Sequence, residues 1–235
     1  VIVVFGVLIF SFWPQIRAGL GGGIKNPQAF IQECVEEELE EAVELVSLQG
    51  GSVEPEYYTL HENLPVEYLC YIHEEYETCS VQQALLKEHI ESEIEGEIEE
   101  VVMGCLDSLE TSYKNRGYDV NLDGETFRVE LLPKRVVAIL NVELTLTKGD
   151  TENYESFDVV LNSNLYEFVG IAKSILEWES VMGNSNPNMY MELYPDLKVE
   201  LKIMSDDTKI YILTNKNDGK IFKFASRSLV FPSGI

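Results

Sequence analysis

The feature that most constrains this chain is its first thirteen residues, VIVVFGVLIFSFW, which are apolar or small apart from Ser11. An apolar segment on a polar body needs a bilayer, a filament core or a partner's groove to remove it from water. As a helix, this segment extends only ~20 Å, less than the ~30 Å hydrocarbon layer of a membrane. We therefore expect an anchor or assembly helix, with residues upstream of Val1 completing a span. Its apolar members are Val1, Ile2, Val3, Val4, Phe5, Val7, Leu8, Ile9, Phe10, Phe12 and Trp13.

Two other interpretations of this segment are weaker. A secretory signal would carry a basic start and a small-x-small cleavage site, and the segment has neither. A buried core helix is the remaining alternative. The run Gly21-Gly22-Gly23 predicts a flexible joint, so we expect residues 1–23 to form an anchor or assembly helix with a glycine hinge.

The remainder of the chain is strongly acidic, with a formal net charge of -24 at pH 7. Between Gln28 and Glu110 there are 23 acidic residues and one basic residue, whereas the segment from Thr111 onward has 18 acidic and 14 basic residues. Such a surface repels nucleic acid, which we therefore exclude as a partner. Solubility at high ionic strength, or resistance to self-association, explains the same charge without any partner.

The four cysteines contain no C-x-x-C pair, so a zinc site is poorly supported. Behind an apolar anchor, an even number of cysteines indicates an oxidising, extracytoplasmic location and two disulfides. Three pairings are possible. We favour Cys34–Cys105, which would join two helices through their apolar stripes, and Cys70–Cys79, which would close a small loop.

Two long amphipathic helices are expected in the acidic part, residues 24–110. Asn26-Pro27 is a helix start, and apolar residues at helical spacing continue to Leu48 before Gly50-Gly51. A capping box at Ser80 and Gln83 predicts a second helix that ends near Leu109. Between them, residues 53–74 predict a β-hairpin with strands 57–61 and 66–72.

Residues 111–235 are expected to form a sheet-rich subdomain with one helix. Alternating or β-branched runs predict strands at 127–132, 135–147, 154–161, 198–204, 209–214 and 221–224, and apolar spacing predicts a helix at 162–182. The predicted fold class is α+β: an N-terminal apolar helix, then a head with a mostly antiparallel sheet and three further helices.

One segment matches a calcium-binding pattern. Its candidate ligands follow D-x-[DN]-x-[DN]-G-x5-E, in which alternating oxygens and a sharp glycine turn surround the ion. Residues 127–131, which follow the glycine turn, alternate in polarity as a strand does, however. A β-hairpin that turns at Asp123-Gly124 is therefore the alternative. No cofactor is required by the sequence, and calcium is the one candidate ion. The candidate ligands are Asp119, Asn121, Asp123, Glu125 and Glu130.

No enzyme class is predicted. His73-Glu74-Glu75 lacks the second histidine of a zinc peptidase, and the chain has no nucleophile elbow, P-loop or dinucleotide fingerprint. Five tyrosines gather around the first hairpin, where they form either a ligand or subunit-contact face or the packed side of the hairpin. They are Tyr57, Tyr58, Tyr68, Tyr71 and Tyr76.

The layout resembles archaeal type IV pilin-like, membrane-anchored surface proteins. The resemblance rests on the apolar segment, the break at Pro14 and the three glycines, and the cysteine-containing helix IQECVEEELEEAVELVSLQGG from Ile31 to Gly51. In that family, a peptidase removes a leader, and the apolar helix sits in the membrane before it packs with its copies into a filament core. This sequence departs from it by a short apolar stretch and by the absence of an acidic residue near the start of the apolar segment.

The resemblance implies a structural subunit of an extracellular filament or cell-surface assembly, packed through its N-terminal helix. The expected partners are further copies of the chain, with the membrane as the location before or instead of assembly. A single-pass, membrane-anchored surface binding or adhesion protein is the alternative function.

Overall fold

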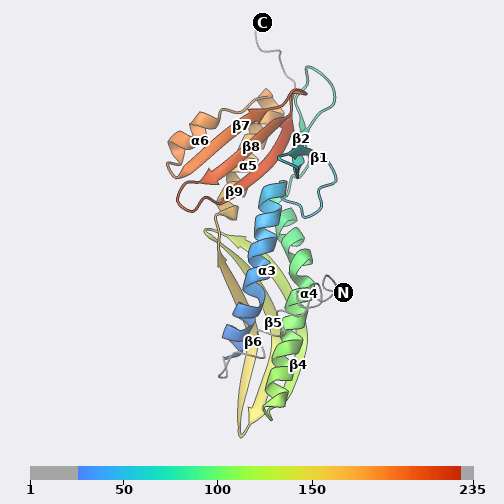
Figure 1. Ribbon diagram of the computed structural model, residues 1–235, viewed down its shortest axis with the longest axis vertical. Coiled ribbons are helices and arrows are strands. Elements are labelled where there is room, and N and C mark those ends of the chain that lie inside the picture. Colours follow the sequence, from blue (N-terminus) through green and yellow to red (C-terminus); the bar gives the residue numbers. More distant parts are fainter. Residues whose placement is uncertain (1–25, 229–235) are drawn as a thin grey trace, which may run out of the picture. The chain divides into compact units, whose positions relative to one another are not determined.

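The computed structural model describes residues 26–228, and in this range the chain has an α+β fold (Figure 1). The helices are α3 (Pro27–Gln49), α4 (Leu86–Asn115), α5 (Leu165–Met182) and α6 (Pro187–Leu193). The strands are β1 (Tyr58–His61), β2 (Leu64–Tyr71), β3 (Ser80–Val81), β4 (Asp119–Leu132), β5 (Arg135–Lys148), β6 (Asp150–Asn162), β7 (Leu197–Ile203), β8 (Lys209–Asn215) and β9 (Ile221–Arg227). The predicted α+β class with mostly antiparallel strands is confirmed for these residues, which contain one helix more than the three expected in the head, and the predicted N-terminal apolar helix lies outside the described residues.

The additional helix, α6, begins with a signal that the sequence does contain. Asn186 caps it by accepting a hydrogen bond from the backbone N–H of Asn188, and Pro187 occupies its first turn. This is the same Asn-Pro start that predicted α3 at Asn26-Pro27. The segment was not predicted to be helical because it has only seven residues, too few for an apolar period to be recognised.

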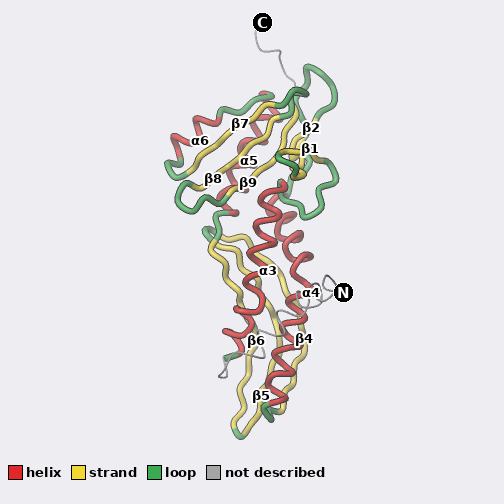
Figure 2. The backbone as a smooth tube through the Cα atoms, viewed as in Figure 1, coloured by secondary structure: helices red, strands yellow, loops and turns green. Residues whose placement is uncertain are grey.

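The strands form two sheets (Figure 2). In the six-stranded sheet the order is β1-β2-β9-β8-β7, with β3 paired to β2 outside this path. Its pairs are antiparallel except for β2 with β9, which is parallel. The three-stranded sheet has the order β4-β5-β6, with turns at Pro133-Lys134 and at Gly149.

The chain divides into two compact units that do not follow the predicted boundary near residue 110. The first unit holds, of the described residues, 26–39, Ile98–Arg128 and Ala138–Val160. The second unit holds Glu40–Glu97, Val129–Val137 and 161–228. Each unit therefore combines distant segments, because α3, α4 and the long strands each contribute residues to both units.

In the first unit, the two helical segments are joined by the predicted disulfide Cys34–Cys105, whose Cα atoms lie 6.0 Å apart. The predicted apolar stripes are buried there, including Ile31, Val35 and Leu109. The amide side chains of α3 also bind the backbone of β6. Gln32 accepts a hydrogen bond from the N–H of Val160 at 3.2 Å and donates one to its C=O at 3.4 Å, and Gln28 donates to the C=O of Asp158 at 2.8 Å. These contacts satisfy polar backbone groups of an edge strand.

In the second unit, α5 contacts β2, β3 and β9 of the six-stranded sheet. The aromatic side chains of Tyr211 and Phe224 stack with their ring centres 5.2 Å apart in this core. Beside them, the fully buried carboxylate of Glu179 accepts hydrogen bonds from the Lys209 ammonium at 2.8 Å and from the Tyr211 hydroxyl. Burial and the neighbouring carboxylate raise the pKa of Tyr211. This buried ion pair fixes α5 on the sheet.

The second disulfide, Cys70–Cys79, is the other predicted pair, and it explains one wrong prediction. The expected helix start at Ser80 is instead strand β3, in which Val81 pairs with Cys70. Helix α4 begins only at Leu86 and continues to Asn115, beyond the predicted end near Leu109. The disulfide and the pairing with β2 hold Ser80 in an extended conformation that its capping pattern alone did not predict.

The predicted hairpin turn at Asp123-Gly124 is also wrong. Gly124 has a φ of +70°, but β4 continues through it to Leu132. The chain reverses at Pro133-Lys134 instead, where Lys134 has a φ of +63°. The first hairpin is confirmed, with β1 and β2 joined at Glu62 and Asn63, which both have a positive φ.

Candidate functional site

The candidate assembly residues Val1, Ile2, Val3, Val4, Phe5, Val7, Leu8, Ile9, Phe10, Phe12 and Trp13 lie outside the described residues. Among residues 26–228, no helix is both long enough and apolar enough to cross a bilayer. The site described below is built from residues 26–228.

The five tyrosines of the first hairpin separate into two groups. Tyr68 is buried and Tyr71 packs against it, with ring centres 5.0 Å apart, so these two belong to the packed side. Tyr57, Tyr58 and Tyr76 are exposed, with Tyr57 showing 72% of its surface. Both alternatives that the sequence left open are therefore realised, each by different tyrosines.

Leu60 accompanies the exposed Tyr58 on β1. The register of β1 and β2 pairs Tyr58 with Glu67 and Leu60 with Pro65, so Tyr58 and Leu60 share one face of the hairpin, whereas Leu64 pairs with His61 on the opposite face. We use the term hairpin surface for Tyr58 and Leu60, which are both exposed. Sequence reasoning found the tyrosine but missed the leucine, whose place two positions further along β1 was the available signal.

A hollow of about 290 Å³ opens on this face. Three hairpin residues and four residues at and after the end of α3 line it: Gln49, Val53, Glu54, Pro55, Tyr58, Leu60 and Pro65. Apolar and proline side chains predominate, and Glu54 and Gln49 supply the polar groups. A concave apolar surface with a few polar groups is suited to an inserted side chain of a partner.

A buried polar cluster lies beneath the loop that forms this hollow. Ser52 donates a hydrogen bond to the Glu67 carboxylate at 2.5 Å, and its Oγ lies 2.8 Å from Nε2 of His89. The carboxylate of Glu93 accepts a hydrogen bond from the backbone N–H of Val53 at 2.8 Å. Burial raises the pKa of Glu67, although the hydrogen bond from Ser52 opposes this shift.

This cluster contains a serine, a histidine and a carboxylate, but not in the order of a catalytic triad. In a triad, the carboxylate orients the histidine through its other ring nitrogen, and the serine hydroxyl faces the substrate. Here the carboxylate binds the serine itself, and Ser52 is only 4% exposed. These hydrogen bonds hold the loop that follows α3 in one conformation. Gly50, with a φ of +89°, is required beside it because a Cβ there would lie 2.9 Å from that of Glu67.

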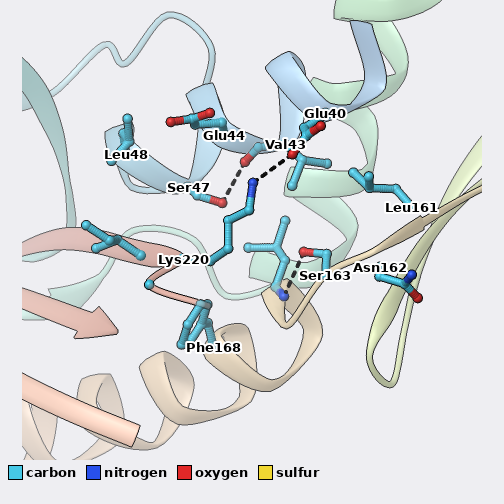
Figure 3. Close-up of a pocket in the computed structure, with 13 residues that line it drawn as sticks. Glu40, Val43, Glu44, Ser47, Leu48, Leu161, Asn162, Ser163, Phe168 and Lys220 are labelled. Carbon is cyan, nitrogen blue, oxygen red and sulfur yellow. Dashed lines mark hydrogen bonds and ion pairs between the residues drawn. The ribbon is translucent and has the colours of Figure 1, made fainter. Parts of the chain in front are cut away.

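A second cavity, of about 130 Å³, lies between the second-unit part of α3, the end of β6 and the start of β9 (Figure 3). The Lys220 ammonium reaches the Glu40 carboxylate at 2.8 Å, and this hydrogen bond raises the pKa of Lys220. The floor is apolar, formed by side chains such as Val43, Leu161 and Phe168. Small-molecule sites usually enclose ~300 Å³ or more, so we do not place the function here.

The calcium-pattern residues do not form a loop. Asp119, Asn121, Asp123 and Glu125 all lie in strand β4. At ~3.3 Å per residue, the Cα atoms of Asp119 and Glu125 are ~20 Å apart, whereas ligands of one ion lie within a few ångströms of each other. Asn121 donates a hydrogen bond to Asp123 at 2.9 Å. In residues 26–228, no group of three or more acidic, histidine or cysteine side chains, Glu130 included, is placed to hold a metal.

No family model, no curated protein and no solved structure matches this chain. The resemblance to pilin-like surface proteins therefore stays a hypothesis, and the function has to be argued from the head itself.

Proposed function

We propose that this chain is a structural subunit of an extracellular or cell-surface assembly, anchored or packed through its N-terminal apolar segment, whose head contacts a neighbouring subunit through the hairpin surface. The observation that carries the proposal is the exposed pair of Tyr58 and Leu60 on the face of the hairpin that borders a hollow.

The exposed side chains support a protein contact. With ~200 Å² for each large side chain, and exposed fractions of 50% and 59%, Tyr58 and Leu60 present roughly 200 Å². This is about a quarter of the ~800 Å² that one partner contributes to a typical specific interface. Tyrosine is enriched among the residues that carry most of the binding energy of such interfaces.

The two disulfides support an extracellular location, because such bonds persist in oxidising compartments. The second of them, Cys70–Cys79, links β2 of the hairpin to the chain segment that leads into β3. A contact surface held this way loses little conformational freedom on binding.

The test compares the intact chain with a double variant, Tyr58→Ser with Leu60→Ser, by electron microscopy of surface material from expressing cells. The wild-type chain should form regular assemblies, and the variant should form fewer or none. The matched control is Leu193→Ser with Tyr194→Ser, since Tyr194 is as exposed as Tyr58 and Leu193 is comparable to Leu60. Assemblies that are unchanged in the hairpin variant would contradict the proposed contact.

The hollow also supports a second candidate function, that of a single-pass, membrane-anchored surface binding or adhesion protein. In that case a foreign protein inserts a side chain between Tyr58 and Pro55. Deleting residues 1–23 separates the two functions. A subunit of an assembly should become a monomer that no longer polymerises, whereas an anchored binding protein should become soluble and keep its ligand.

A further inference from the structure

The opposite face of the same hairpin carries a group of basic side chains on a chain that is otherwise acidic. His61, at the end of β1, lies beside Lys202 of β7, and their nitrogens Nε2 and Nζ are 3.4 Å apart. Lys223 of β9 is almost fully buried, with only 7% of its side chain exposed. Three basic side chains thus gather at one place in a protein of net charge -24.

A single carboxylate, that of Glu62, faces all three basic groups. Its oxygens lie 3.4 Å from Nζ of Lys223, 3.6 Å from Nζ of Lys202 and 3.7 Å from Nδ1 of His61. Lys223 donates a hydrogen bond to Glu62 that, at 3.4 Å, is longer than the ~2.7–2.9 Å usual between charged groups, and the other two contacts are longer still. The Glu62 side chain is 63% exposed, so the space that its carboxylate occupies is open to solvent.

His61 provides a second, independent observation that points to a ligand. The ammonium of Lys202 has only donors, so Nε2 of His61 accepts and the ring proton is on Nδ1. Nδ1 is buried and has no hydrogen-bond partner among the described residues, and the side chain is only 10% exposed. Buried donors without a partner are rare in folded proteins, because leaving them unsatisfied costs free energy.

The turn that carries Glu62 is also under strain. Glu62 has a φ of +56° and Asn63 a φ of +68°, a region that residues other than glycine and asparagine seldom adopt. The Glu62 side chain is 63% exposed on this turn, so its carboxylate can move outward into solvent without disturbing the core.

We propose that His61, Lys202 and Lys223 form a binding site for a small oxyanion, a carboxylate or phosphate group, which replaces the Glu62 carboxylate. The anion accepts hydrogen bonds from Nδ1 of His61 and from the two ammonium groups. Glu62 occupies the site while the anion is absent and swings outward when it binds.

Histidine NMR tests this inference directly, since the chain has only three histidines, His61, His73 and His89. The full chain is titrated with sodium phosphate and, in a separate series, with sodium acetate, both at constant ionic strength. Burial lowers the pKa of His61 in the free protein, with Glu62 opposing this and the two lysines adding to it. Binding should shift the His61 resonance saturably and raise its pKa, with His73 and His89 unchanged. The two titrations show which of the two anions binds more tightly.

Variants separate binding from a structural role of the cluster. Lys202→Met should weaken anion binding about tenfold or more, and Glu62→Gln should strengthen it by removing the competing carboxylate. The matched control is Lys114→Met, because Lys114 is similarly exposed and also pairs with a glutamate, Glu110. This control should bind as the wild type does.

Two results would overturn the inference. One is a His61 resonance that shows no saturable response to either anion. The other is a response that persists unchanged in both Lys202→Met and Glu62→Gln. Lys202 is about half exposed, so its variant should fold, and the test does not depend on replacing the buried Lys223.

Discussion

The two units use polar groups in different ways. In the first unit, polar side chains complete the backbone of the sheet, as Gln28 and Gln32 do for β6. In the second unit, charged groups are buried with their partners, as Glu179 is, or held near a partner at long distance, as Lys223 is. The exposed apolar hairpin surface belongs to the second unit as well. The polar side chains named here therefore stabilise a sheet edge in the first unit, whereas the second unit holds both the buried ion pair and the proposed contact surface.

The largest predicted effect concerns the disulfide of the first unit. Replacing Cys34 and Cys105 by serine should lower the free energy of unfolding by about 4 kcal/mol, because the bond closes a loop across a separation of 71 residues. Replacing Cys70 and Cys79, with a separation of 9, should cost only about 2.5 kcal/mol. Urea unfolding of both variants measures the difference. Equal losses would show that loop length does not set the contribution of these bonds.

The next largest effect should come from the buried ion pair of the second unit. Glu179→Gln leaves the Lys209 ammonium without a countercharge and should cost about 3 kcal/mol. Glu40→Gln is the control, since it breaks an ion pair between half-exposed groups and should cost less than about 1 kcal/mol. Urea unfolding again provides the measurement. If both variants lose the same free energy of unfolding, the buried pair contributes no more to the stability of this unit than an exposed pair does.

A smaller effect is expected at the edge of β6 in the first unit. Gln32→Ala removes two hydrogen bonds to Val160 and should cost about 1–2 kcal/mol, whereas Gln28→Ala removes one and should cost about half as much. Hydrogen exchange at the Val160 amide should accelerate in the Gln32 variant only. Unchanged exchange would mean that the glutamine does not protect this edge.

The hairpin surface should contribute little to stability. Tyr58→Ser and Leu60→Ser should each change the free energy of unfolding by less than about 0.5 kcal/mol, since both side chains are exposed. The buried neighbour Val66, replaced by alanine, should cost more than 1 kcal/mol by comparison. A large loss at Tyr58 or Leu60 would identify the surface as part of the core and weaken the proposed contact.

The smallest effect is expected for calcium. Because Asp119 to Glu125 form a strand, thermal unfolding curves in calcium and in chelator should coincide for the wild type. Asp123→Ala should likewise respond equally in both conditions. A higher melting temperature in calcium, abolished by this substitution, would restore the calcium site that the sequence pattern predicted.

Local patterns were sufficient for much of the fold. The apolar spacing from Ile31 to Val46 identified the buried face of α3, and Cys34 and Cys105 were paired correctly because each lies on an apolar stripe. The hairpin β1–β2 followed from alternation around a turn. The stripes and the hairpin depend on residues within a few positions of each other, which is why the sequence shows them, and the cysteine pair was inferred from the two stripes.

The errors occurred where distant contacts override local preference. Ser80 has a good capping pattern, but its neighbour Val81 pairs with Cys70 and forms a strand. Asp123-Gly124 is a favoured turn pair, but β5 holds β4 extended through it. In both places the free energy of strand pairing exceeds that of a local cap or turn.

By itself, the sequence determined the α+β class, the acidic surface and the buried stripes, and it favoured the cysteine pairing that the structure shows. Only the tertiary structure decided which tyrosines are exposed, and it alone brought His61 and Glu62 to Lys202 and Lys223, up to 161 positions away. The physical reason is that strand order in a sheet, here β1-β2-β9-β8-β7, is set by packing over the whole unit and leaves no periodic trace along the chain.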